Sequence, residues 1–257
     1  MERGHVPSTP SPTPSASPNI CETEALIVRG GRRFEPLLER ELDRPLRQLA
    51  GRLPGATAGV FVTPEFAGPN GIADLVAVTR ASAGIESRIE SGIALVDRLA
   101  LATVAAAVPI GRGTTAAQVE WRIGMSRRQV AGYLRELETS GAVKEVAGKY
   151  RRHPAIVPVG RMYAFEAKVS DWNRAISQAA RYSTWADASG VVLLHPPKNL
   201  TDVVRHAKSL RLGLAIGDKW IVQPTIGRRA NALHAGSRLL ASERFIHSVG
   251  SLRHSLT

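Results

Sequence analysis

The chain alternates between two spacings of apolar residues. Two apolar runs, 71–78 and 161–168, have the length and composition of buried strands. Between 171 and 186 the apolar residues instead recur at helical spacing, and a third strand-like run follows at 190–194. Strands and helices therefore follow one another along the chain, which predicts an α/β fold.

Charged residues interrupt both of the longer strand-like runs. Asp74 lies in the middle of the first run, where an unpaired buried carboxylate is costly. Glu166 and Lys168 lie near the end of the second run, and residues two apart on a strand point to the same face. A lone Glu-x-Lys pair also fits a solvated ion pair at a strand end, but a second carboxylate on a neighbouring strand favours a functional site.

Two carboxylates beside one lysine suit a divalent cation. Mg²⁺ prefers oxygen ligands and keeps several waters, and Mn²⁺ is expected to substitute for it. Lys168 would orient or activate a water, or stabilise negative charge that develops on a phosphate. We therefore expect Asp74 and Glu166 to converge with Lys168 around one metal ion.

The order and spacing of these residues resemble the PD-(D/E)XK nuclease superfamily, and their last two members resemble the Q-x-x-x-Y motif of its RecB-like branch. The matching residues are Asp74, Glu166, Lys168, Gln178 and Tyr182. The resemblance covers about 30–80 and 158–225. It departs from the family pattern at Ala73, where the family motif has Pro.

The resemblance implies a restriction-endonuclease-like core, in which a central mixed sheet is flanked by helices in the order helix, three strands, helix, strand. By this resemblance Asp74 and Glu166 would be metal ligands and Lys168 the catalytic lysine. Gln178 and Tyr182 would shape the DNA side of the site.

The superfamily often adds an acid from its first helix, and Glu41 is the candidate here. The apolar spacing predicts a helix from about Phe34 to Leu49, and Glu41 falls in the middle of its apolar face. A charge in an apolar stripe needs a partner or a metal. Two interpretations stay open: Glu41 is a third metal ligand, or it pairs with Arg40 or Arg44.

The stretch 86–154, between the two halves of this site, has a different organisation. Its expected elements are a long or broken helix at 89–108, a short helix at 116–123, a helix at 126–140 and a hairpin at 142–151. This order of elements resembles a winged helix-turn-helix: a helix, a short helix, a turn, a helix and a hairpin.

A recognition helix of this kind places its N-terminal residues at base edges. Arg127, Arg128 and Gln129 occupy that position, and Arg and Gln suit guanine and adenine respectively. Wing and phosphate contacts would come from Lys144, Lys149, Arg151 and Arg152. The alternatives are that the unit binds a protein, or that the arginines are only solvated.

Composition sets the outer limits. The 257 residues fit one large or two small domains. The formal charge of +12 fits a polyanionic partner such as DNA. An arginine-rich composition is also expected from a GC-rich genome, so the charge alone does not identify the partner. A single Cys21 fits a reducing cytoplasm. Seven scattered His residues do not predict a zinc site, and no stretch is apolar enough for a membrane span.

We therefore expect a disordered Pro- and Ser-rich tail at 1–27, a nuclease core in two parts at 28–85 and 155–257, and a winged-helix insertion at 86–154. A last helix is expected at about 237–249. The expected function is a Mg²⁺-dependent DNA nuclease, and a homodimer is compatible with the sequence. The alternative function is a non-cleaving, DNA-binding transcriptional regulator or adaptor on a nuclease-like scaffold.

Overall fold

The computed structural model describes residues 20–22, 41–227 and 232–255. A seven-stranded mixed sheet forms the centre, in the order β1-β2-β3-β6-β7-β8-β9. Its strands are β1 (Ile20–Glu22), β2 (Val60–Gly68), β3 (Gly71–Thr79), β6 (Arg161–Lys168), β7 (Ala188–Leu193), β8 (Gly213–Ile216) and β9 (Lys219–Val222). Strand β3 runs antiparallel to both of its neighbours, β2 and β6, whereas β6, β7 and β8 are parallel. The expected α/β class is confirmed.

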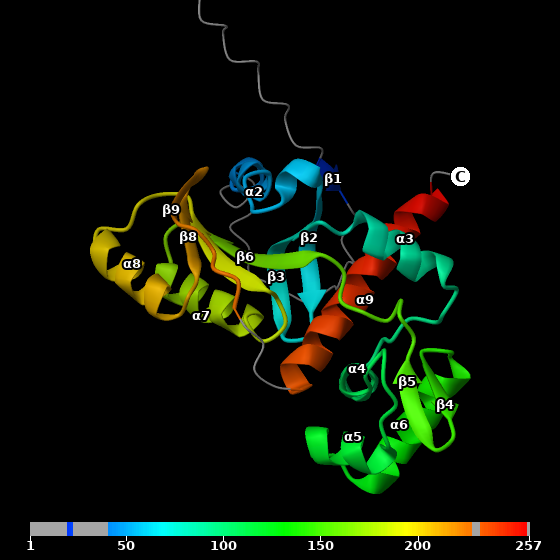
Figure 1. Ribbon diagram of the computed structural model, residues 1–257. Helices are drawn as coiled ribbons and strands as arrows, with labels where there is room; N and C mark the ends of the chain where they lie inside the picture. Colours follow the sequence, from blue (N-terminus) through cyan, green and yellow to red (C-terminus); the bar gives the residue numbers. More distant parts are fainter. Residues whose placement is uncertain (1–19, 23–40, 228–231, 256–257) are drawn as a thin grey trace, which may run out of the picture.

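Helices cover both faces of this sheet, as Figure 1 shows. The helices of this part are α2 (Asp43–Ala50), the 3₁₀ turn η1 (Ala56–Ala58), α3 (Ser82–Glu90), α7 (Trp172–Tyr182), α8 (Leu200–Ser209) and α9 (Ala232–Ser255). Alternation along β6 assigns its side chains to the two faces. Tyr163 and Phe165 pack with α2, whereas Met162 and Ala164 pack with α7 and α9.

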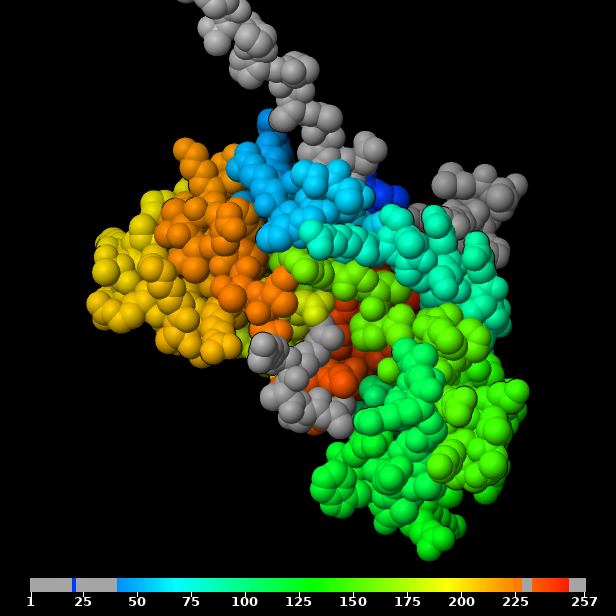
Figure 2. Space-filling model, viewed as in Figure 1, coloured from blue at the N-terminus to red at the C-terminus, as the bar shows by residue number. Residues whose placement is uncertain are grey.

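The second unit projects from the sheet as a separate lobe (Figure 2). It contains α4 (Leu99–Ala107), α5 (Ala116–Ile123), α6 (Arg127–Thr139), β4 (Val143–Val146) and β5 (Lys149–Arg152). Capping boxes at Thr115 and Ser126 begin α5 and α6. Gly124 ends α5 in a left-handed conformation, and Ala147 and Gly148 form the tight turn of the hairpin. The short helix, turn, helix and hairpin expected here are confirmed as elements.

Helix α9 contributes side chains to the core of the central sheet and to the core of the lobe. Leu239 and Leu240 pack inside the cluster formed by α4, α5 and α6. Further along α9, Phe245 and Ile246 pack against side chains of β2, β3 and β6 in the core of the central sheet. Gly236 lets α9 approach α4 closely, since a Cβ atom there would lie 2.6 Å from the Cα of Thr103. The lobe therefore completes its core with a helix that the sequence assigned to the other domain.

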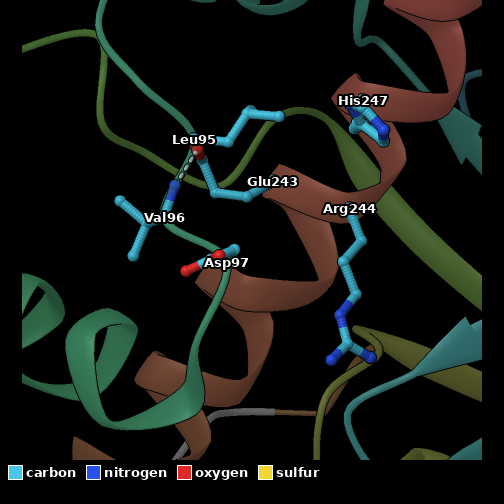
Figure 3. A pocket seen from close by; sticks show the side chains of 6 residues that line it. All are labelled: Leu95, Val96, Asp97, Glu243, Arg244 and His247. Carbon is cyan, nitrogen blue, oxygen red and sulfur yellow. Dashed lines mark hydrogen bonds between the residues drawn. The ribbon is translucent and has the colours of Figure 1, made fainter.

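Both chain segments that connect the lobe to the sheet are also held by α9. The buried Arg88 guanidinium donates to both carboxylate oxygens of Glu243, at 2.9 and 2.7 Å. Glu243 also accepts from the backbone N–H of Val96 at 3.0 Å, the contact drawn in Figure 3. On the return segment, the Val159 N–H donates to Ser242, and Arg238 donates to the Val159 carbonyl.

A pocket of about 350 Å³ opens beside this junction, with Leu95, Asp97, Arg244 and His247 on its rim (Figure 3). Arg244 reaches across to the carbonyls of Ala67 and Gly68 at the end of β2. The junction thus has polar contacts to the sheet as well as to the lobe.

Several expected boundaries change. Residues 20–22, assigned to the tail, form β1 and pair in parallel with β2. The expected boundary at 86 lies inside α3. Of the two forms expected for 89–108, a long helix or a broken one, the structure has the broken one, with an irregular segment at 91–98 between α3 and α4. The first part of the helix expected from Phe34 lies outside the described residues, and α2 begins at Asp43.

The Arg88–Glu243 pair is expected to be essential for stability. Arg88→Met leaves a buried carboxylate without its partner, so we expect a loss of about 3–5 kcal/mol in the free energy of unfolding, measured by urea titration. Combining it with Glu243→Leu should recover part of this loss, because no buried charge then remains. Asp202→Asn, which breaks the exposed Arg205–Asp202 pair, is the control and should leave the midpoint nearly unchanged. An unchanged midpoint for Arg88→Met would contradict this assignment.

Candidate functional site

Strands β3 and β6 and helix α7 bring the expected residues together. Glu166 and Lys168 follow Met162 and Ala164 on the face of β6 that α7 covers, while Phe165 and Ala167 pack on the other face. The register that pairs Leu75 with Phe165 continues to Asp74 opposite Glu166. The shared orientation expected for Glu166 and Lys168 is confirmed.

The three charged groups are in direct contact. The Nζ atom of Lys168 lies 2.8 Å from Glu166 Oε1 and 3.6 Å from Asp74 Oδ2. It also donates to the carbonyl of Ala167 at 2.9 Å. Asp74 Oδ2 accepts from the Ala167 N–H at 2.7 Å, which fixes this carboxylate against β6. Two acids from distant parts of the chain therefore share one ammonium group.

Tyr182 connects α7 to this group. Its hydroxyl lies within hydrogen-bond distance of both the Ile72 carbonyl and Glu166 Oε2. A hydroxyl has one proton, so it can donate to only one of these oxygens. When it donates to Ile72, whose carbonyl can only accept, a protonated Glu166 completes the second hydrogen bond as the donor.

Burial also favours the protonated form of Glu166, whose side chain is 0 % exposed. Desolvation is the main cause that raises the pKa of Glu166, and the negative charge of Asp74 raises the pKa further. Lys168 and Tyr182 lower the pKa of Glu166, but by less than burial and Asp74 raise it. The net result is a raised pKa for Glu166, even though the Lys168 ammonium lies beside it.

Among the described residues, two buried side-chain oxygens lack a hydrogen bond: Glu166 Oε1, which is ion-paired with the Lys168 ammonium at 2.8 Å, and Gln178 Oε1. Gln178 lies one helical turn before Tyr182, on the same side of α7. Unsatisfied buried oxygens are costly unless something binds them. A small cation with oxygen ligands fits this donor set, with Asp74 and Glu166 as the charged ligands.

Glu41 does not join these acids. It is exposed and precedes α2, so the expected burial in an apolar face is wrong. Among the described residues, no three or more His, Cys, Asp or Glu side chains form a group that could hold a metal ion. The acidic part of the site therefore consists of Asp74 and Glu166.

Glu65 is a neighbour that the sequence did not indicate. The β2–β3 register pairs Pro64 with Leu75 and Phe66 with Ala73, which places Glu65 opposite Asp74. Glu65 is exposed and has a positive φ of 45°, a conformation that is uncommon for a residue with a side chain. A polar residue inside the apolar run 60–68 was the available signal.

The expected nucleic-acid contacts divide into two groups. Arg127 and Arg128, and the hairpin residues Lys144, Lys149 and Arg151, are exposed. Gln129 instead caps its own helix, because its Oε1 accepts from the N–H and hydroxyl of Ser126. Arg152 is half-buried, its Nε finds no hydrogen-bond partner in the part of the chain that the structure describes, and desolvation lowers its pKa. The structure thus assigns Gln129 a capping role and turns Arg152 partly inward.

Comparisons with protein-family models, with curated proteins and with solved structures find no match. In the described part of the chain, no helix has both the length and the apolar character that a membrane span requires.

Glu166→Gln is expected to stabilise the protein at neutral pH when EDTA removes divalent cations. The pKa of Glu166 is raised by folding, so its contribution to stability is present below its ordinary pKa and is lost as pH rises through the folded pKa. Glutamine keeps the shape and stays neutral. Thermal unfolding from pH 4 to 8 should therefore show a midpoint difference that favours the variant and widens with pH.

Glu145→Gln changes an exposed carboxylate of the hairpin and serves as the control, with no such widening. If the wild type instead becomes more stable than Glu166→Gln as pH rises, the prediction is wrong. The attraction between ionised Glu166 and Lys168 then outweighs the cost of burying the Glu166 carboxylate.

Proposed function

We propose that this protein is a Mg²⁺-dependent DNA nuclease that hydrolyses phosphodiester bonds. The convergence of Asp74, Glu166 and Lys168 on one face of adjacent strands carries the proposal. Two acids can hold a metal ion and a neighbouring lysine can stabilise charge on a phosphate, so this arrangement suits metal-assisted phosphodiester hydrolysis.

The surroundings favour a functional site over a structural ion pair. A solvated pair at a strand end would leave its carboxylate exposed, whereas Glu166 is fully buried and shares the Lys168 ammonium with a second acid. Burying the Glu166 carboxylate near the half-buried Asp74 is unfavourable for folding alone. Perturbed ionisable groups of this kind are concentrated at functional sites.

The element order also supports the proposal. Helix α2, strands β2, β3 and β6, helix α7 and strand β7 occur in this order along the chain, with α3 and the lobe from α4 to β5 inserted between β3 and β6. The same order, helix, three strands, helix, strand, is implied by the resemblance to PD-(D/E)XK nucleases. In that reading, a restriction-endonuclease-like core presents Gln178 and Tyr182 from the helix after the lysine strand.

Each residue of the site has a separate task. Asp74 and Glu166 would hold the cation, and a bound Mg²⁺ would stabilise negative charge on the phosphate as a Lewis acid. Tyr182 fixes Glu166 Oε2, and the Ala167 N–H fixes Asp74 Oδ2, so neither carboxylate has to reorganise when substrate arrives. Lys168 keeps its ammonium beside both acids, where it can orient a water or a phosphate oxygen.

The lobe formed by α4 to β5 supplies the DNA contact in this proposal. Its helix, turn, helix and hairpin resemble a winged helix-turn-helix, and five exposed basic residues lie at the start of α6 and on the hairpin. The residues are Arg127, Arg128, Lys144, Lys149 and Arg151. Such a surface neutralises phosphates without regard to sequence.

Cleavage of plasmid DNA tests the proposal. With Mg²⁺ or Mn²⁺ we expect nicking or degradation that EDTA stops, and Lys168→Ala and Asp74→Asn should each lower the rate by about 10²–10³-fold, as expected for loss of a charge that stabilises the transition state. Gel densitometry measures the rate.

Lys208→Ala removes an exposed lysine of α8 and should cut at the wild-type rate. Equal cleavage by the wild type and both site variants would assign the activity to a contaminant. DNA binding without cleavage would instead favour a regulator or adaptor.

A further inference from the structure

The pocket at the junction of the lobe and the sheet has no role in the proposed function. Its walls come from the segment that leads from α3 into the lobe and from α9, so it lies where two structural units meet (Figure 3). Small-molecule sites occur preferentially at such interfaces, and their volumes are roughly 300–1,000 Å³. The volume of about 350 Å³ found here falls at the lower end of that range. The pocket therefore has the place and the size of a site for a small ligand.

Arg244 brings a fixed positive charge to this pocket. Its Nη1 atom donates to the carbonyls of Ala67 and Gly68, both at 3.0 Å, which orients the guanidinium. Within the described part of the chain, its Nε and Nη2 atoms have no hydrogen-bond partner, and no carboxylate lies within ion-pair distance. Desolvation lowers the pKa of Arg244, and the more distant charge of Asp97 counteracts this only in part. A half-buried cation is thus held in place with one side open.

The two acids of the pocket already have cations of their own. Glu243 accepts from two nitrogens of the buried Arg88 guanidinium. Asp97 lies 3.8 Å from Arg98 Nε, and in Figure 3 its carboxylate points away from Arg244. Arg244 therefore carries the charge that the pocket leaves uncompensated, and the ligand that offsets it is an anion.

Leu95 adds an apolar contact to the same pocket. Its side chain is 37 % exposed, although that of the next residue, Val96, is buried. Figure 3 shows the Leu95 side chain turned toward α9, the helix that carries Arg244. An apolar surface beside a few fixed polar groups is typical of sites for small organic molecules. The ligand is therefore expected to have an apolar body as well as an anionic end.

A carboxylate fits the anionic end better than a phosphate does. The open edge of Arg244, formed by Nε and Nη2, can donate to both oxygens of a carboxylate in a bidentate pair. A phosphate monoester carries up to two negative charges at neutral pH. Because Asp97 and Glu243 also line the pocket, they repel such a dianion more strongly than a monoanion.

We propose that this junction pocket binds a small organic carboxylate with an apolar body. The carboxylate is held by the open edge of Arg244, and the apolar body packs against Leu95. The inference goes beyond the proposed function and depends neither on a cation at Glu166 nor on DNA binding.

Binding of hexanoate to the full chain tests this inference. A ligand-observed NMR titration at constant ionic strength measures the dissociation constant. We expect saturable binding of hexanoate, with an affinity that rises about fourfold per methylene from butanoate to hexanoate, since each methylene is buried against the apolar wall. Hexanamide has a similar body without the charge and should bind at least about tenfold more weakly to the wild type.

Variants of the two contact residues assign the binding to this pocket. Arg244→Met should weaken hexanoate binding by about tenfold and remove the preference over hexanamide. Leu95→Ala should reduce the dependence of affinity on chain length. The controls are Arg205→Met on α8 and Leu233→Ala on α9, which change exposed side chains of the same types and should bind hexanoate like the wild type.

The outcomes separate this inference from its alternatives. Absence of saturable hexanoate binding, or equal binding of hexanoate and hexanamide, would overturn the inference from the wild type alone, even if Arg244→Met does not fold. Unchanged hexanoate binding by a folded Arg244→Met would place the anion elsewhere and also overturn it. Tighter binding of hexyl phosphate than of hexanoate would reject the carboxylate. Plasmid cleavage is measured separately, so failure of the nuclease proposal and failure of this inference are distinguishable.

Discussion

The burial of the Glu166 carboxylate beside Asp74 is the constraint on which the site depends. A fully buried carboxylate near a second, half-buried one is stable only if a proton or a cation offsets their charge. Lys168 supplies one positive charge, and Tyr182 supplies a hydroxyl that accommodates either state of Glu166. The pairing of β3 with β6 and the packing of α7 hold these groups together. A sheet that needed only stability would place an apolar residue at each acidic position.

Helix α9 imposes the second constraint. It fills the core of the lobe with Leu239 and Leu240 and the core of the sheet with Phe245, and its polar residues hold both connecting segments. The lobe is therefore fixed to the sheet by buried contacts and not only by its two covalent connections. In the proposed function, this places the DNA-contacting surface and the candidate catalytic residues on one frame.

The sequence predicted the centre of the site because it follows from local rules. A strand period of two sets Glu166 and Lys168 on one face, and the cost of an unpaired charge identifies Asp74. Glu41 was misplaced because its helical angle assumed a helix from residue 34, whereas α2 begins two residues after it. The capping role of Gln129 was not foreseen, because a capping glutamine and a base-reading glutamine occupy the same sequence position. The double role of α9 was out of reach, since apolar spacing does not specify which core a leucine enters.

Binding of the cation itself tests the central claim most directly. Isothermal titration calorimetry with Mg²⁺ or Mn²⁺ would compare the wild type with Asp74→Asn, which keeps the size of the side chain and removes one ligand charge. The account predicts a binding signal in the wild type that is lost or strongly weakened in Asp74→Asn while both proteins remain folded by circular dichroism. Equal cation binding by the two proteins, or no binding by the wild type, would contradict it.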